Sequence, residues 1–432
     1  MQRDIIIVGG GIIGAAVAYA LGLRGMGERI CIIERAQPAA AATSRAAALV
    51  TLVRDKPNLI ALVKESYSAI ARLEKTQHED VGRHQSGALY VAPQSHHASM
   101  QALAQICAEH GISHRELDKA QALQHAPWLK PEAFDVAFFF EQEIYCDPYQ
   151  LASAYLRGAT RMGAKLLHGE VASIHQGEAP AATTQAAKAG EAEDGATTKP
   201  ATKPRAAQGV TLADGTYLPA SQIVVAAGAW SSLLAEPLGI ALPMAPVRSQ
   251  YWITQTAPHF ARDGAIVLMP EIQAYARPEV GALIFGIREQ HAVAANPRTL
   301  PADLSRLVFD ADNPDGFNDL VENADKLNRY FAHFEQTGIA HHMSGPSCYT
   351  SDGALVLGEA EHISGLYFAT GYNGGGIAFA AGMGRVIAEL IEGVKPYTDI
   401  AAHRPERLGY FDAFAPEFLQ HCATSRSNKT SG

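Results

Sequence analysis

The sequence predicts an α/β fold with two parts: a Rossmann-like unit, and a discontinuous α+β unit built on a mostly antiparallel sheet with helices. Residues 4–35 read as strand, glycine turn, helix and second strand, which is the βαβ pattern of the first part. Residues 247–290 read as successive strands with aromatic and basic side chains, which favours an antiparallel sheet for the second. A chain of 432 residues that is 47% hydrophobic can bury a core in each.

The glycine turn of the first part has a dinucleotide-binding spacing. Gly9 permits a tight turn after the apolar run, Gly11 lets the backbone approach a pyrophosphate, and Gly14 lets the helix pack on the sheet. Glu34 ends the second strand about 20 residues later, where a carboxylate can bind a ribose. An acid there favours FAD or NAD over NADP, and the turn alone leaves FAD and NAD open.

Composition limits the class of protein. A net charge of -9 and a pI near 6.0 argue against a nucleic-acid surface. The five cysteines have no C-x-x-C spacing, so we expect a reducing, cytoplasmic setting without a metal site. The apolar N-terminus contains the glycine turn, so we interpret it as a strand and not as a targeting segment. No stretch reads as a membrane span, and peripheral membrane contact stays open.

Further elements follow along the chain. Helices are expected over 59–75 and 98–110 and after Asp147-Pro148, and a strand over 86–92. Residues 178–208 are rich in Ala, Thr, Lys, Glu and Pro and predict a low-complexity, mobile insertion. Near the C-terminus a strand, a glycine-rich turn and a long helix form a second place where ligand atoms can meet helix N–H groups.

Four sequence blocks resemble one family. They are VGGGIIG with IIER; ATSRAAAL at 42–49; VVAAGAWS at 224–231 with PVRSQ; and GPSCYTSDGALVLG with ATGYNGGGI. In this order and spacing the chain resembles the D-amino acid oxidase-like flavoenzymes, the group of glycine oxidase, sarcosine oxidase and D-amino acid dehydrogenases. The resemblance implies FAD, since a second glycine turn far along the chain suits a cofactor that spans the molecule.

The resemblance also implies which residues bind FAD and how the chain divides. The expected FAD-binding residues are Gly9, Gly11, Ile12, Ile13, Gly14, Glu34, Arg35, Thr43, Ser44, Arg45, Ala47, Ala48, Leu49, Val171, Ala227, Gly228, Trp230, Gly345, Asn373, Gly374, Gly375, Gly376 and Ile377. The expected division is an FAD-binding domain over 1–85, 145–240 and 340–400, a substrate domain over 86–144 and 241–339, and a C-terminal extension over 401–432 with a mobile tail.

The implied activity is oxidation of the CH–NH bond of a small amine or amino acid, with hydride transfer to the flavin and hydrolysis of the imine. Candidate substrates are D-amino acids, N-methyl amino acids and cyclic imino acids, and the acceptor is O₂ or a quinone-type carrier. Arg288 and Glu289 follow a strand after which oxygen-reactive relatives place a lysine, which leans toward a dehydrogenase. The alternative activity is oxidation of a 2-hydroxy acid or glycerol phosphate; a flavin subunit of a biosynthetic or RNA-modifying assembly is disfavoured by the charge.

The substrate pocket departs from the family pattern. Ser347 stands where amino acid oxidising members place a carboxylate-binding Arg, and Ala378 where sarcosine-oxidising members place a Lys. The cations left as candidates are Arg54, Lys56, Arg277 and Arg288, with Arg54 and Arg277 preferred. Aromatic candidates for the pocket wall are Tyr251, Trp252, Tyr275 and Tyr349, with Tyr275 the best single choice and Trp252 expected in the core.

Cys348 bears on how FAD is attached. In relatives with covalent FAD the cysteine lies two residues before the Tyr of a Tyr-Thr pair, whereas Cys348 immediately precedes Tyr349. We therefore expect non-covalent FAD.

Overall fold

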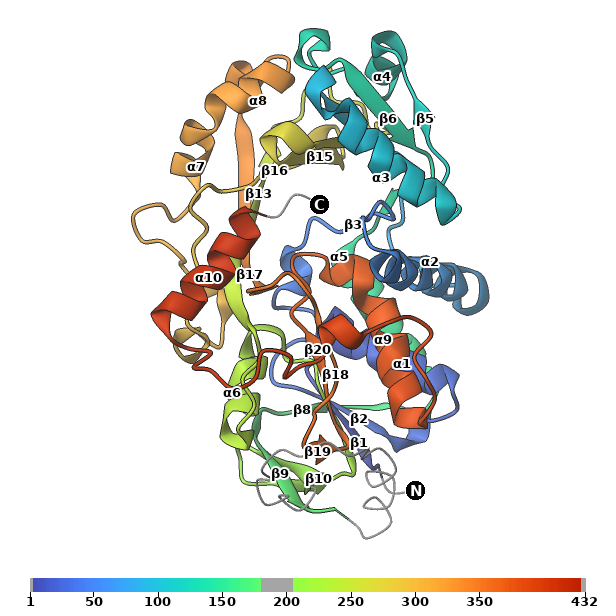
Figure 1. Cartoon of the computed structure of the whole chain (residues 1–432), viewed down its shortest axis with the longest axis vertical. Helices are drawn as coiled ribbons and strands as arrows, with labels where there is room; N and C mark the ends of the chain where they lie inside the picture. The colour runs from blue at the N-terminus through green and yellow to red at the C-terminus, as the bar shows by residue number, and fades with distance from the viewer. Residues whose placement is uncertain (1–2, 180–204, 429–432) are drawn as a thin grey trace, which may run out of the picture.

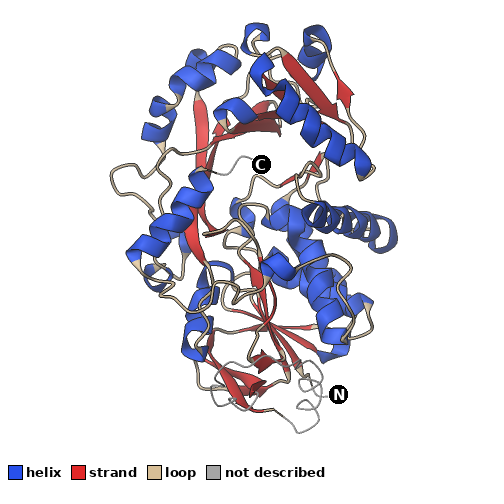
Figure 2. Ribbon diagram, in the orientation of Figure 1, coloured by secondary structure: helices blue, strands red, loops and turns tan. Residues whose placement is uncertain are grey.

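A computed structural model describes residues 3–179 and 205–428 of the chain. Within them, two sheets lie at opposite ends of an elongated molecule, with the long helices α2, α5 and α9 between them (Figure 1). The secondary structure is mixed, as Figure 2 shows, so the α/β fold class is confirmed.

The first sheet contains the predicted βαβ unit. Its six strands are ordered β18-β20-β12-β1-β2-β8. Their bounds are Val356–Glu359 (β18), Leu366–Thr370 (β20), Gln222–Val225 (β12), Ile5–Val8 (β1), Ile30–Glu34 (β2) and Lys165–His168 (β8). All neighbours are parallel except β18 and β20. Parallel strands place their carboxyl ends at one edge, which is where ligands bind in open α/β sheets.

Helices cover this sheet and connect it to the second one. α1 (Ile12–Leu23) contacts α5 (Pro148–Arg161) and α9 (Gly376–Glu392), and α9 also contacts α2 (Pro57–Gln77). α5 begins as predicted, with the Asp147 side chain accepting a hydrogen bond from Gln150 N at its N-cap. Together these helices bury the largest apolar cluster, which reaches from β1 to β4.

The second sheet is mostly antiparallel, as predicted. Its eight strands are ordered β17-β13-β16-β15-β14-β4-β6-β5, and only β14 and β4 pair in parallel. Their bounds are Ile339–Thr350 (β17), Met244–Thr254 (β13), Ala282–Ile287 (β16), Ala274–Glu279 (β15), Ile266–Met269 (β14), Ala88–Ala92 (β4), Val136–Phe140 (β6) and Arg115–Glu116 (β5). Figure 1 shows α3 (His97–Glu109), α4 (Lys119–His125), α7 (Phe317–Glu322) and α8 (Ala324–Tyr330) around it.

Smaller elements complete the described chain. A second antiparallel layer is formed by β9 (Val171–Glu178), β10 (Arg205–Leu212) and β11 (Tyr217–Pro219), with β19 (Ile363–Ser364) parallel to β10. β3 (Leu49–Val50) pairs with β7 (Ile144–Tyr145), and α6 spans Ser231–Ala235. Helix α10 (Pro416–Ser427) lies in the expected C-terminal extension and contacts β13 and β17.

Three features of the expected domain division concern these elements: the boundary at 340, the insertion over 178–208 and the C-terminal extension. β17 begins at residue 339 and belongs to the eight-stranded sheet, so the expected boundary at 340 assigns a strand of that sheet to the other domain. The expected insertion over 178–208 lies largely outside the described residues, and its two ends belong to the paired strands β9 and β10. Of the expected C-terminal extension over 401–432, Pro416–Ser427 form α10, and residues 429–432 lie outside the described residues. The two-domain division itself stays a proposal.

Candidate cofactor and substrate site

One elongated cavity runs from the glycine turn after β1 to the eight-stranded sheet. Its volume is about 940 Å³, at the upper end of ligand pockets. The lining comes from the carboxyl edge of the first sheet at one end and from β13, β15, β16 and β17 at the other. A cavity of this shape suits a long, thin cofactor at one end and a small substrate at the other.

Close backbone approach explains the glycines of the first turn. Gly9 has a φ of +108°, and a Cβ there would lie 2.5 Å from the carbonyl oxygen of Ala226, the residue after β12. A Cβ on Gly14 would lie 1.9 Å from Gly9 O, so the helix could not stay in place. A Cβ on Gly11 would meet only Thr43 Oγ1, at 3.5 Å, so Gly11 leaves open the space that a pyrophosphate needs.

Glu34 and Arg35 line the same end. Glu34 accepts hydrogen bonds from Gly10 N at 2.7 Å and from Ala36 N at 2.9 Å, which fixes its carboxylate at the cavity wall. The Arg35 guanidinium lies 4.0 Å from the ring centroid of Trp230, and both residues line the cavity. This geometry fits the expected adenosine end of FAD, with Glu34 facing the ribose.

A second glycine turn faces the middle of the cavity. Gly374 has a φ of +81°, and Gly375 is the N-cap residue of α9. A Cβ on Gly374 would lie 2.5 Å from Tyr349 Oη, so the turn and that tyrosine pack closely. The N–H groups at the start of α9 are thus available to the polar edge of a flavin ring.

Most of the expected FAD-binding residues line this cavity. Those that do are Gly9, Gly11, Ile12, Ile13, Glu34, Arg35, Thr43, Arg45, Ala47, Ala48, Leu49, Val171, Ala227, Gly228, Trp230, Gly345, Gly374, Gly375, Gly376 and Ile377. Three expected residues do not: Gly14, Ser44 and Asn373.

Gly14, Ser44 and Asn373 pack behind the residues that line the cavity. Gly14 packs on Gly9, and Ser44 Oγ donates to the carbonyls of Ala40 and Ala41. The Asn373 side chain accepts a hydrogen bond from Thr350 N at 2.8 Å and donates to Gly353 O at 3.0 Å. These contacts support the wall of the cofactor end, and a direct contact of these three residues with FAD stays a prediction.

Three tyrosines gather at the substrate end of the cavity. Tyr251 on β13, Tyr275 on β15 and Tyr349 on β17 all line it, together with Ser347. Tyr275 packs against Gly286, where a Cβ would lie 2.5 Å from its ring. Burial raises the pKa of Tyr251 and of Tyr275, so both phenols stay protonated. Trp252 lies in the core against Phe285, which agrees with its expected packing role.

The two preferred arginines occupy different places. Arg54 is buried and lines the cavity, with Nη1 donating to Thr51 Oγ1 and Val53 O. Arg277 does not line it: Nε donates to Ala47 O at 2.9 Å, Nη1 to Glu279 at 2.5 Å, and its guanidinium covers the Tyr145 ring. Arg277 therefore anchors the segment 42–49 through Ala47, and we withdraw it as a candidate for substrate binding. Of the other two candidates, Arg288 lines the cavity and Lys56 does not.

Cys348 lies behind the cavity wall. It is fully buried in an apolar cluster with Val356 and Phe368, and burial raises the pKa of its thiol to about 11. A protonated thiol outside the cavity lining is a poor nucleophile, which supports the expectation of non-covalent FAD.

Arg426 is a charged cavity residue that was not anticipated from the sequence. Arg426, on helix α10, lines the substrate end and is 6% exposed. No motif marks it, because an arginine in a short C-terminal helix usually lies in solvent. In the structure Cys422, one turn earlier on α10, is fully buried, which shows that this helix is docked.

Residues capable of proton transfer are scarce in the cavity lining. Among the described residues that line it, none is a histidine, lysine or cysteine. The three carboxylates are engaged elsewhere: Glu34 with Gly10 N, Glu170 with Arg35, and Asp303 with Ser305. The described residues also contain no group of three or more metal-ligating side chains, and none of their helices could cross a membrane. The site is thus built for binding and orientation and contains no evident general base.

The comparisons with known proteins agree with this geometry. The family described as "FAD dependent oxidoreductase" (DAO) matches residues 4–390. The chain is 25% identical over 417 residues to mitochondrial dimethylglycine dehydrogenase of Mus musculus, covering 94% of this chain and 44% of that protein. The chain thus spans less than half the length of this curated relative.

Solved structures show the same fold. Glycine oxidase from Geobacillus kaustophilus superimposes with a TM-score of 0.71 at 23% identity, covering 94% of this chain and 99% of that one. L-proline dehydrogenase from P. horikoshii gives a TM-score of 0.75 at 20% identity, covering 94% and 98%.

Proposed function

The chain belongs to the family of FAD dependent oxidoreductases, and from this premise we propose that it oxidises the CH–NH bond of a small amine or amino acid. The observation that carries the proposal is the tyrosine-walled substrate end of the cavity, where the described lining residues offer hydrogen-bond donors and include no histidine, lysine or cysteine. Relatives and neighbours named as dimethylglycine dehydrogenase, glycine oxidase and L-proline dehydrogenase support it.

The scarcity of side chains that can accept a proton among the described lining residues favours an amine substrate over an alcohol. A neutral amine has a lone pair that drives the oxidation, whereas a hydroxyl group has to lose its proton to a base as the C–H bond breaks. The residues that line the cavity would hold FAD, which would supply the acceptor for the hydride of the carbon next to nitrogen; water would then hydrolyse the imine. This argument favours the amine reading over a 2-hydroxy acid or glycerol phosphate.

The residues of the chain bind and orient the substrate. The guanidinium groups that line the cavity disfavour a second cation beside them, so they favour loss of the proton from the substrate ammonium nitrogen. The protonated hydroxyls of Tyr251 and Tyr275 can donate hydrogen bonds that fix the substrate. The aromatic walls can hold the C–H bond of the substrate in place.

The test is anaerobic mixing of the purified holoprotein with D-amino acids, N-methyl amino acids, cyclic imino acids and the matching 2-hydroxy acids. We expect at least one amino compound to bleach the flavin absorbance. Bleaching by hydroxy acids alone would overturn the proposal.

The electron acceptor and the cofactor linkage are part of the same proposal. Because no described residue lining the cavity is a lysine, we propose a dehydrogenase that passes electrons to a quinone-type carrier. Slow reoxidation of the reduced protein by O₂ is the expected result.

We also propose that FAD is non-covalent, so acid precipitation should release all of the yellow colour. The five free, buried cysteines support a reducing compartment such as the cytoplasm.

A further inference from the structure

Helix α10 brings the end of the described chain to the substrate cavity. It lies beyond residue 390, where the family match ends. Leu419, Cys422 and Ala423 are buried in a cluster with Val247 and Tyr349, and Figure 1 shows α10 beside β17. This docking fixes Arg426, near the last turn of the helix, at the cavity wall.

The guanidinium of Arg426 is buried with much of its hydrogen-bonding capacity unused. The residue is 6% exposed, and among the described residues neither Nε nor Nη1 has a hydrogen-bond partner. Nη1 lies 3.6 Å from Glu289 Oε2, which is too long for a hydrogen bond. A buried charged group whose N–H donors lack acceptors destabilises the folded protein. A ligand in the cavity that accepts these hydrogen bonds would remove that cost.

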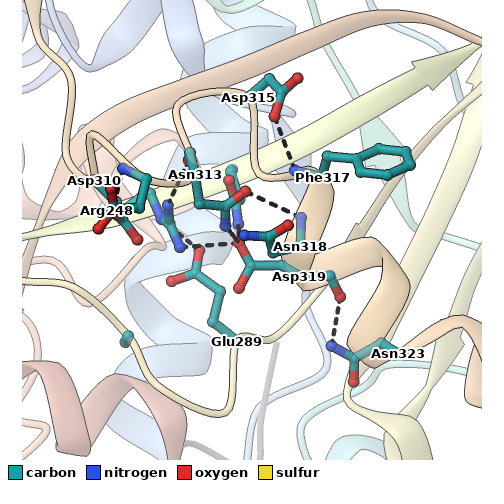
Figure 3. Close-up of polar contacts among 12 residues, drawn as sticks. Arg248, Glu289, Asp310, Asn313, Asp315, Phe317, Asn318, Asp319 and Asn323 are labelled. Carbon is teal, nitrogen blue, oxygen red and sulfur yellow. Dashed lines mark hydrogen bonds and ion pairs between the residues drawn. The ribbon is translucent and has the colours of Figure 1, made fainter.

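Glu289 positions Arg426 but is shared with another arginine. Its Oε1 accepts a hydrogen bond from Arg248 Nε at 3.2 Å, and Arg248 Nη2 also pairs with Asp319 at 2.9 Å (Figure 3). The Glu289 backbone carbonyl accepts a hydrogen bond from Ser427 Oγ, the residue next to Arg426. The network therefore anchors the end of α10 while leaving guanidinium N–H groups for the cavity.

The position of Arg426 suits contact with a substrate. Its guanidinium carbon lies 5.8 Å from the ring centroid of Tyr349, one of the three tyrosines at the substrate end. It also acts electrostatically on Tyr275 and on Arg288, both of which line the same part of the cavity. The guanidinium of Arg426 therefore lies at the substrate end of the cavity.

We propose that Arg426 binds the carboxylate of the substrate, so that the substrate is an amino acid and not an uncharged amine. The proposal rests on the proposed function for the identity of the site. A guanidinium offers two parallel N–H donors that match the two oxygens of a carboxylate. Arg426 thus supplies from the C-terminal helix a cation that β17 lacks at Ser347, two residues before Tyr349.

The experiment measures binding without turnover. The holoprotein is titrated with benzoate and with its neutral isostere benzamide, and binding is followed by the change in flavin absorbance. We expect benzoate to bind at least about tenfold more tightly than benzamide, because only benzoate can form the charge-assisted pair. R426Q should abolish that preference and leave the benzamide affinity unchanged, and R426K should retain part of it.

A matched control separates charge from helix docking. S427A removes the hydrogen bond to Glu289 O and keeps the guanidinium, so the preference for benzoate should persist. Equal affinities of the wild type for the two probes would contradict the proposal, as would an R426Q or R426K variant that keeps its FAD and its full preference. The wild-type comparison stands even where R426Q fails to fold. Because no turnover is involved, failure of the proposed oxidation would appear separately, in the anaerobic mixing experiment.

Discussion

The two ends of the cavity are built in different ways. The nucleotide end comes mainly from short, local segments, since Gly9, Gly11 and Glu34 lie within one βαβ unit. The substrate end collects Tyr251, Tyr275, Tyr349 and Arg426 from three strands and a C-terminal helix. In this protein, local backbone geometry therefore determines the cofactor end, whereas substrate specificity depends on how distant segments pack together.

Replacement of Gly14 tests the local end and should have the largest effect. A Cβ at this position would lie 1.9 Å from Gly9 O, which is backbone and cannot move aside. We therefore expect Gly14→Val to be purified without FAD. The absorbance ratio of flavin to protein measures the outcome. Gly393→Ala is a comparison that strains the backbone, because Gly393 has a φ of +78°, but brings no new atom within 4 Å, so it should keep its FAD. Full FAD loading in Gly14→Val would contradict the account.

Removal of the Glu289 carboxylate tests how the distant end is held together. The side chain is fully buried and lies between Arg248 and Arg426, so Glu289→Gln removes a counter-charge that the two guanidinium groups share and leaves Arg248 paired with Asp319. Breaking a buried pair in this way costs about 3–5 kcal/mol.

Thermal unfolding of the holoprotein measures this change. Glu236→Gln, which removes an exposed pair with Arg298, is the matched control and should cost about 0–1 kcal/mol. Equal melting temperatures for the two variants would show that the network does not stabilise the docking of α10.

Tyr275→Phe should separate the two ends with a smaller effect. The change removes one hydroxyl from the substrate end and leaves the nucleotide end untouched. We expect full FAD content and a loss of about tenfold in kcat/KM, which is the size of one hydrogen bond to substrate. A steady-state assay with the best amino compound measures it. A loss of FAD, or no change in kcat/KM, would remove Tyr275 from the substrate wall.

Glu143 is buried outside the cavity lining, and its effect on stability should depend on pH. It accepts hydrogen bonds from Leu52 N and Val53 N, just before Arg54, and burial raises its pKa from 4.5 to about 8. The folded state therefore holds this proton more tightly than the unfolded state, so the contribution to stability falls as the pH rises from 4.5 to 8.

The melting temperature of Glu143→Gln should therefore rise relative to the wild type across this range. Glu141→Gln, two residues away and exposed, is the matched control and should run parallel to the wild type. A difference between Glu143→Gln and the wild type that is independent of pH would contradict the raised pKa.

The sequence predicted the nucleotide end well because its signals are local. The glycine spacing and the acid at the end of β2 act through backbone contacts within about 30 residues. The strands of the second sheet were also predicted, but not how far each reaches along the cavity. Tyr275 and Arg277 lie on the same face of β15, yet only Tyr275 lines the cavity. The place of Arg426 in the cavity wall could not be predicted from the sequence. It depends on the docking of α10, and no periodic pattern in the sequence predicts that docking.

The most direct test of the central claim is the pH dependence of anaerobic flavin reduction with amino acids of different amine pKa. The account holds that the cavity oxidises a neutral amine without a base from the protein. The apparent pKa of the reaction should therefore follow the amine pKa of each substrate. A single apparent pKa, the same for all substrates, would reveal a catalytic base in the protein and contradict the account.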